Sequence, residues 1–187
     1  MLANQIGYYS LILGLIFSIY LCGIAVKDFN NKIKKLNPNI ITLSFLQLTF
    51  VIISFLSLIM SFIKSDFSNE TVFNNSHTTK PLFYKITGTW GNHEGSLLLW
   101  LLVLTLFIFL FLIKSREQPK KYRISTLLFQ QLIIIGFFLF VLMTSNPFNY
   151  LFPIPSEGLG LNPILQDPAL AIHPPLLYLG YVGSSII

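Results

Sequence analysis

Four long apolar segments constrain this chain more than any other feature of its sequence. They cover residues 6–26, 40–63, 95–113 and 124–143, and crossing a bilayer takes roughly 20 mostly apolar residues. Only 10% of the 187 residues are charged and 53% are hydrophobic, whereas about one quarter of a soluble domain is charged. Because backbone groups must pair with one another inside lipid, each segment is predicted to be a helix. The expected fold is an all-α polytopic transmembrane bundle.

The basic residues indicate how these helices are oriented. Nine of the twelve Lys and Arg residues fall in two connections, residues 27–35 and 114–123. Loops on the cytoplasmic or matrix side of a membrane carry such an excess. We therefore expect these two loops inside and the N-terminus outside. The basic residues separate apolar segments and do not form one aromatic-studded face, so the net charge of +5 does not indicate nucleic-acid binding.

The sequence argues against two kinds of catalytic site. The single cysteine, Cys22, lies within an apolar segment, so the chain can form neither an internal disulfide nor a C-x-x-C redox pair. A zinc hydrolase of the H-E-x-x-H type would need a second histidine after His93 and Glu94, where Leu97 stands. Because the chain has a single cysteine, thiol redox chemistry would require a partner protein.

Two long outer connections differ in composition. Residues 65–80 are rich in Asn, Ser and Thr and show no sign of a packed core, which predicts a mobile surface loop. Residues 144–175 instead contain a series of prolines, each of which fixes its own φ and restricts the residue before it. This second connection is predicted to be an outer loop that is shaped without regular secondary structure.

The sequence His173-Pro174-Pro175 predicts the outer start of a fifth helix, because proline is well tolerated in a first helical turn. From there to Ile187 twelve residues would span only about 18 Å, short of a hydrocarbon core of about 30 Å. We expect further sequence or another chain to complete the bundle beside this helix. The expected architecture is thus four full spans plus the outer start of a fifth.

A first group of candidate site residues begins with the sequence Trp-Gly-Asn-His-Glu-Gly-Ser at residues 90–96. At helical spacing Trp90, His93 and Trp100 would share one stripe, which would place an imidazole between two indoles at the outer membrane surface. Such a stripe is either a wall facing a ligand or an aromatic belt that anchors the helix. In the aromatic-belt alternative, Glu94 would be favoured by the positive end of the helix dipole.

A second group leads from residue 157 through the prolines to His173. A neutral imidazole can ligate haem iron, and the two prolines that follow His173 would fix its direction. The start of the helix could also receive an anionic group such as a haem propionate. The alternative is a histidine that caps the helix or bonds within the loop.

The two motifs together carry a resemblance to a known family. The sequence at residues 90–96, the Leu-Asn-Pro-Ile-Leu-Gln-Asp-Pro sequence at residues 161–168 and the sequence that follows from His173 to Gly183 resemble the N-terminal signatures of CcmF-type cytochrome c haem lyases. The motifs agree with that family in order and spacing across most of residues 1–187. The resemblance indicates the N-terminal transmembrane portion of such a lyase, in a split mitochondrial form.

The resemblance implies a function in cytochrome c biogenesis (system I) at the outer side of a mitochondrial inner membrane or a bacterial plasma membrane. His173 matches one of two outer histidines that ligate the incoming haem, while Trp90, His93 and Trp100 are further candidates for haem contacts. The second outer histidine and the tryptophan-rich loop of the family belong to later sequence. The implied partners are a C-terminal CcmF-like companion chain that shares the haem, CcmE-type and CcmH-type proteins, apocytochrome c and the lipid membrane.

Two other functions remain open from the sequence. The chain could be a structural subunit of a larger respiratory membrane complex that retains the motifs without turnover. It could also carry ions or protons, since Glu94 lies near a membrane helix, although the spans otherwise lack ionisable residues.

Overall fold

The computed structural model describes residues 1–31, 35–160, 162 and 166–185, and the regular elements within these ranges are all helices. In chain order they are α1 (Leu2–Phe29), α2 (Pro38–Ile63), α3 (Glu70–Asn75), α4 (Leu82–Gly88), α5 (His93–Lys114), α6 (Lys120–Met143) and α7 (Pro168–Ser184). Among the described residues, α1, α2, α5 and α6 are long and apolar enough to cross a membrane. The predicted all-α bundle with four spans is confirmed.

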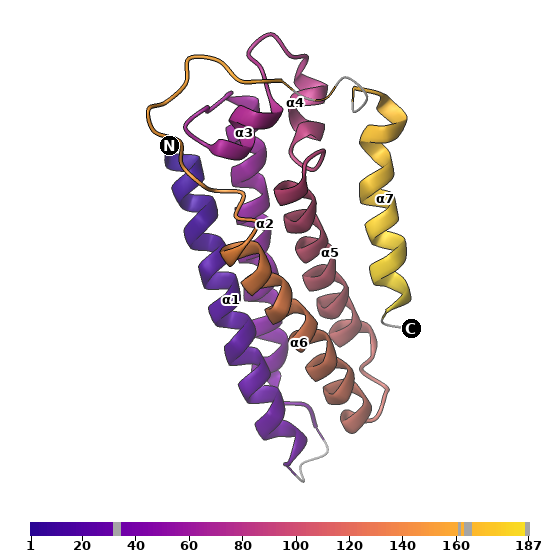
Figure 1. Ribbon diagram of the computed structural model, residues 1–187. Helices are drawn as coiled ribbons and strands as arrows, with labels where there is room; N and C mark the ends of the chain where they lie inside the picture. The colour runs from indigo at the N-terminus through magenta and orange to yellow at the C-terminus, as the bar shows by residue number, and fades with distance from the viewer. Residues whose placement is uncertain (32–34, 161, 163–165, 186–187) are drawn as a thin grey trace.

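The four long helices run alternately up and down and close around a common core (Figure 1). Helix α1 packs against α2 and α6, and α5 packs against α2 and α6 from the other side. The core includes the fully buried side chains of Leu11, Leu98 and Phe138. Gly14 allows the Phe138 ring to approach α1, because a Cβ at Gly14 would lie 2.9 Å from the ring. The bundle is therefore held by close side-chain packing.

A polar network crosses the interior of the bundle. The Ser18 hydroxyl on α1 donates to Gln131 Oε1 on α6 (2.7 Å), and Gln131 Nε2 donates to Gln47 Oε1 on α2 (3.1 Å). All three side chains are buried. Since a polar group inside lipid is costly without a partner, this network ties three helices together at one level.

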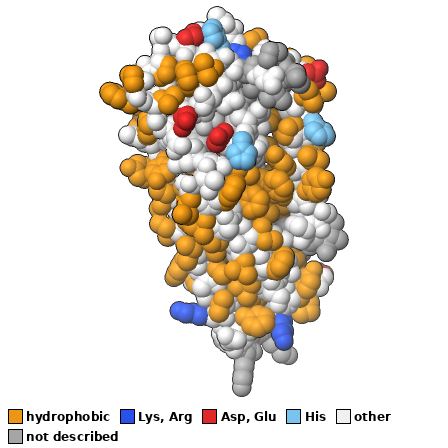
Figure 2. All heavy atoms as spheres, viewed as in Figure 1, with side chains coloured by type: hydrophobic (Ala, Val, Ile, Leu, Met, Phe, Trp, Pro, Cys, Tyr) orange, Lys and Arg blue, Asp and Glu red, His pale blue; other side chains and the backbone are white. Residues whose placement is uncertain are grey.

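Charged side chains mark the two ends of the bundle. The connection between α1 and α2 and the connection between α5 and α6 lie at the same end, at the bottom of Figure 1, and most of the Lys and Arg side chains visible in Figure 2 lie at that end. There the Lys120 ammonium pairs with Asp28 Oδ1 at 2.8 Å. Hydrophobic side chains cover the middle of the visible face. The two Lys-rich loops thus share one membrane surface, as the charge bias requires of inner loops.

The outer end of the bundle is covered by a packed cap, in contrast to the mobile loop expected for residues 65–80. We call α3 with its preceding residue Asn69, together with residues 144–152, the outer cap. Asn69 Nδ2 donates to Asn4 Oδ1 (2.6 Å) and to Pro147 O (2.8 Å), and Asn69 Oδ1 accepts from Val72 N (3.0 Å). Val72 is fully buried. The prediction of a mobile loop was wrong because Asn69 forms hydrogen bonds with polar groups of α1, α3 and residues 144–152. With these groups paired, a segment of polar composition can be buried.

Candidate functional site

Helix α7 begins five residues earlier than the sequence predicted. The Asp167 carboxylate caps it by accepting from the N–H groups of Ala169 (2.8 Å) and Leu170 (3.0 Å), and Pro168 occupies the first turn. His173 therefore lies within the helix and not at its start, and Pro174 and Pro175 lie inside it. The sequence held the signal that was missed, because an aspartate followed by proline is a favoured helix start.

The two prolines remove two N–H donors from the hydrogen bonds of α7, and a tryptophan replaces one of them. Proline has no N–H, so Pro175 cannot donate to the carbonyl of Ala171, which is four residues earlier. The indole Nε1–H of Trp90 donates to this oxygen at 2.8 Å. One indole thus compensates for Pro175 and fastens the outer part of α7, next to His173.

Trp90 is held in place by the turn that precedes α5. Asn92 caps α5 by accepting from Gly95 N (2.8 Å), and its amide donates to the carbonyl oxygens of Gly88 (2.7 Å) and Thr89 (3.1 Å). A Cβ at Gly95 would lie 1.6 Å from the Thr89 oxygen, so only glycine permits this return of the chain. Within this tight turn, Trp90 stacks on Phe55 of α2, with ring centroids 6.3 Å apart.

The expected stripe of an imidazole between two indoles is not formed. Helix α5 begins only at His93, so Trp90 lies outside it. The Trp100 ring stacks on Tyr178 of α7 with centroids 5.0 Å apart and also contacts Phe137 of α6. Both tryptophans therefore pack against α7 at different levels, and they hold that helix against the bundle.

His93 is exposed and is bonded away from α7. Its Nε2 atom lies 3.0 Å from the Ser145 hydroxyl, which belongs to the connection after α6. Glu94 lies in the first turn of α5, where the sequence placed it. His93 thus fastens the outer cap to α5 in this structure.

His173 differs from the other two histidines in having an exposed imidazole without a hydrogen-bond partner among the described residues. His77, by comparison, bonds to Thr79. Within the described part of the chain, no three His, Cys, Asp or Glu side chains are close enough to hold a metal ion by themselves. His173 is therefore available as a single ligand to a group that approaches α7 from outside.

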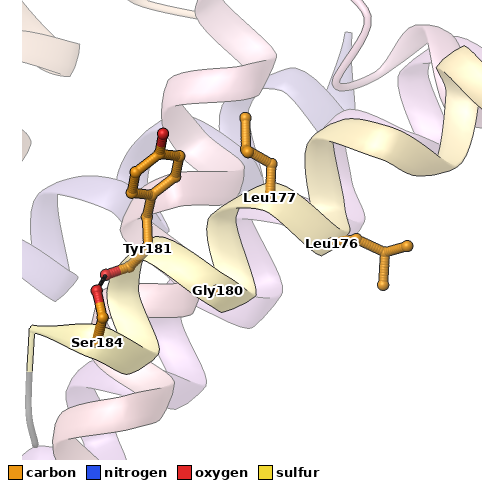
Figure 3. A pocket seen from close by; sticks show the side chains of 5 residues that line it. All are labelled: Leu176, Leu177, Gly180, Tyr181 and Ser184. Carbon is orange, nitrogen blue, oxygen red and sulfur yellow. Dashed lines mark hydrogen bonds between the residues drawn. The ribbon is translucent and has the colours of Figure 1, made fainter.

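An open groove runs along α7 below His173. It has a volume of about 410 Å³ and is lined by Leu176, Leu177, Gly180, Tyr181 and Ser184 (Figure 3). These positions follow His173 by three, four, seven, eight and eleven residues, which is the spacing of one helical face. Gly180 has no side chain, and no other atom lies within 4 Å of the place where its Cβ would be. The middle of this face is therefore open space. The exposed imidazole and the mostly apolar groove share one face.

Comparison with known proteins places these residues in a family. A family model described as cytochrome C assembly protein matches residues 90–187, a range that includes both tryptophans, His173 and the groove. The chain belongs to the cytochrome c assembly protein family. This match and the relatives below confirm the CcmF-type resemblance on which the sequence prediction rested.

The chain is 46% identical over 185 residues to the cytochrome c-type biogenesis protein CycK of Rhizobium meliloti, covering 97% of this chain and 27% of CycK. It is 46% identical over 134 residues to CcmF of Escherichia coli, covering 71% of this chain and 21% of that protein. The solved structure of cytochrome c haem lyase CcmF superposes with a TM-score of 0.80 at 26% identity, covering 98% of this chain and 29% of the other.

This member of the cytochrome c assembly family thus spans about a quarter of the length of the curated relatives that it matches. Haem ligation at the α7 face is compatible with the donor present, because an exposed imidazole without a partner is a suitable axial ligand. If this chain holds haem, His173 would be the residue that offers a donor to the iron, and the groove below it would face an apolar ring edge. The two tryptophans contribute by fixing α7.

Proposed function

We propose that this chain is the N-terminal subunit of a haem lyase, which positions haem for covalent attachment to apocytochrome c at the outer side of its membrane. The observation that carries the proposal is that His173 heads the face of α7 that continues into the groove. Haem combines an iron that accepts imidazole with a large apolar ring, so the chemistry of this face matches the chemistry of the ligand.

The residues of this chain would act by orientation and ligation. Haem supplies the vinyl groups that become bonded to the apocytochrome thiols, and reaction at a fixed position requires that the ring be held still. His173 would hold the iron from one side, while the Trp90 and Trp100 contacts keep α7 from shifting against the bundle. Family membership, reported above, supports cytochrome c biogenesis as the process.

We further propose that the haem is shared with a companion chain. The companion chain that the resemblance implies would supply the second ligand and a wall opposite α7, from residues that correspond to parts of CycK outside the 27% matched here. The resemblance to the family indicates CcmE-type and CcmH-type proteins and apocytochrome c as the other partners. We propose the mitochondrial inner membrane as the location, with a bacterial plasma membrane as the alternative that the bacterial relatives favour.

The test is the substitution His173→Ala in cells that depend on this chain for cytochrome c. We expect the yield of holocytochrome c to fall at least about 10-fold, together with the haem that co-purifies with the chain and its companion. His77→Ala is the matched control, because His77 also lies on the outer side but its contacts are with Thr79 and Glu157, outside α7. An unchanged holocytochrome yield in His173→Ala would contradict the ligand role.

A second variant tests the groove without touching the imidazole. Gly180→Leu would fill the groove, and the space around Gly180 accommodates the side chain within this chain. We expect lower haem occupancy with normal amounts of folded chain. Normal holocytochrome yield in both variants, with purification only within a respiratory complex, would instead favour a structural subunit.

A further inference from the structure

A second concave site lies at the opposite end of the molecule from His173. This inner pocket has a volume of about 340 Å³ and lies between the start of α2, the connection that follows α5 and the start of α6. Four basic side chains line it: Lys35, Arg116, Lys120 and Arg123. It belongs to the end of the bundle that carries both Lys-rich loops, which the charge bias places at the inner membrane surface.

The positive charge of the inner pocket is only partly neutralised. Lys120 pairs with Asp28 at 2.8 Å. The buried guanidinium of Arg123 donates to two neutral groups, Ser115 Oγ (3.1 Å) and Leu112 O (2.6 Å). Neither acceptor carries a charge that would neutralise the guanidinium. Lys35 and Arg116 have no carboxylate partner within the described residues. The four basic side chains of the pocket therefore have a single carboxylate partner among the described residues, and the pocket carries net positive charge.

Two helix starts add to this positive potential. Helix α2 begins at Pro38 and α6 at Lys120, and both residues line the inner pocket. The start of a helix carries partial positive charge from N–H groups that have no partner within the helix. Pro119, which precedes α6, makes no side-chain cap, and the partial positive charge of this helix start favours an anion.

The apolar part of the inner pocket indicates the source of the anion. Leu36 and Ile41 line the pocket beside the cations, and Phe45, one helical turn after Ile41, is 52% exposed on the lipid-facing surface. A headgroup held by the cations would therefore have an apolar path for its acyl chain along α2. We propose that the inner pocket binds the phosphate group of an anionic phospholipid from the inner leaflet.

The proposal is tested on the full chain, purified in a non-ionic detergent, by counting bound lipids with native mass spectrometry as phosphatidylglycerol is titrated. Lys35→Gln combined with Arg116→Gln removes two exposed cations that have no carboxylate partner, so the fold should persist. We expect phosphatidylglycerol to bind about 30-fold more weakly to this double variant, from roughly fivefold for each charge at a membrane surface.

The matched control is Lys114→Gln combined with Lys121→Gln, which removes the same charge from the end of α5 and the start of α6, at the same end of the bundle but outside the inner pocket. Here we expect less than about a threefold change. Equal weakening in both double variants would overturn the proposal, since it would indicate only general surface attraction. Inorganic phosphate that displaces phosphatidylglycerol at equal concentration would also overturn it, by identifying a free phosphate as the ligand.

Discussion

The four long helices and α7 are attached to the molecule in different ways. Helix α6 buries eight residues along its length, whereas within the described part of α7 only Ala171 and Val182 are buried. Instead, α7 is fastened by single contacts at three levels: the Trp90 bond to Ala171, the stacking of Trp100 on Tyr178, and the Gln130 Nε2 bond to Ser185 O at 3.0 Å. The remaining face of α7 is left open.

This difference affects how rigidly each part of the molecule is held. A bundle packed on all sides resists deformation, because its core side chains fill the space between the helices. A helix held by few directional contacts keeps a free face and still has a fixed orientation. The bundle can therefore act as a rigid support on which α7 presents His173.

The largest effect is expected from Phe138→Ala, which empties the centre of the bundle. Phe138 is fully buried against α1. Its truncation should lower the free energy of unfolding by about 3 kcal/mol, because the lost packing contacts are only partly recovered by relaxation. The measurement is equilibrium unfolding in mixed micelles, followed by circular dichroism.

Phe140→Ala is the control for this substitution, because Phe140 lies on the same helix but is 46% exposed toward lipid. Its loss should cost less than about 0.5 kcal/mol. Equal losses of unfolding free energy in both variants would contradict a close-packed bundle. The difference in packing between the four long helices and α7 would then not hold.

A smaller loss is expected from Asn69→Ala in the outer cap. The substitution removes three hydrogen bonds and leaves Pro147 O and Asn4 Oδ1 without this donor in a buried site. The free energy of unfolding should fall by about 2–3 kcal/mol. Asn75→Ala is the control, since it removes a single bond to Thr71 O within α3. If the two variants unfold alike, the cap contributes less to the bundle than its contacts indicate.

Trp90→Phe should open α7 without unfolding the bundle. The phenyl ring retains an aromatic group beside Phe55, but the Ala171 carbonyl loses the donor that compensates for Pro175. Hydrogen exchange of α7 amides should accelerate by an amount equal to about 1–2 kcal/mol, while global unfolding changes by less than about 0.5 kcal/mol. Trp100→Phe provides the comparison, because no hydrogen bond of its indole within the described residues is lost. Acceleration throughout the bundle would refute the separate attachment of α7.

Hydrophobicity and charge were sufficient to predict the bundle from the sequence. The four spans follow from apolar runs that no soluble fold would expose, and the helix ends were placed to within four residues. The assignment of His173 as a candidate also came from the sequence, through its motif. These features depend on local composition or on a pattern of neighbours along the chain, which the sequence displays directly.

The contacts between distant segments could not be predicted in the same way. Helical spacing alone predicted that Trp90 shares a face of α5 with His93 and Trp100. In the structure the Asn92 cap starts the helix after Trp90, and the Trp90 indole bonds to Ala171, which is 81 residues away. The packing of residues 65–80 was missed for the same reason, because Asn69 finds its partners at residues 4 and 147. A polar composition indicates exposure only when no distant group completes the hydrogen bonds.

The smallest expected effect concerns the contact between residues 76–80 and the loop before α7. The Thr78 hydroxyl donates to Glu157 Oε2 (2.5 Å) and the Thr78 N–H to Oε1 (2.9 Å), and these bonds lower the pKa of Glu157 to about 2. A depressed carboxyl pKa stabilises the contact above the unfolded value of about 4.3, and this stabilisation is lost as the pH falls toward 2. Hydrogen exchange of residues 76–80, corrected for intrinsic rates, should therefore accelerate between about pH 4.5 and pH 2.

Glu157→Gln identifies the group responsible, since the amide retains the shape of the side chain but does not titrate in this range. The variant should show faster exchange in residues 76–80 at neutral pH and no further change on acidification. His77 Nε2 lies 3.8 Å from Glu157 Oε1, so His77→Gln should be measured alongside it to separate the effect of this contact from that of the Thr78 bonds. In every variant exchange of α5 and α6 should stay constant, because the core of the bundle does not depend on this outer contact. If hydrogen exchange of α6 also accelerates as the pH falls, the outer loops and the bundle would unfold as one cooperative unit. The attachment of α7 would then not be separate from the packing of the four long helices.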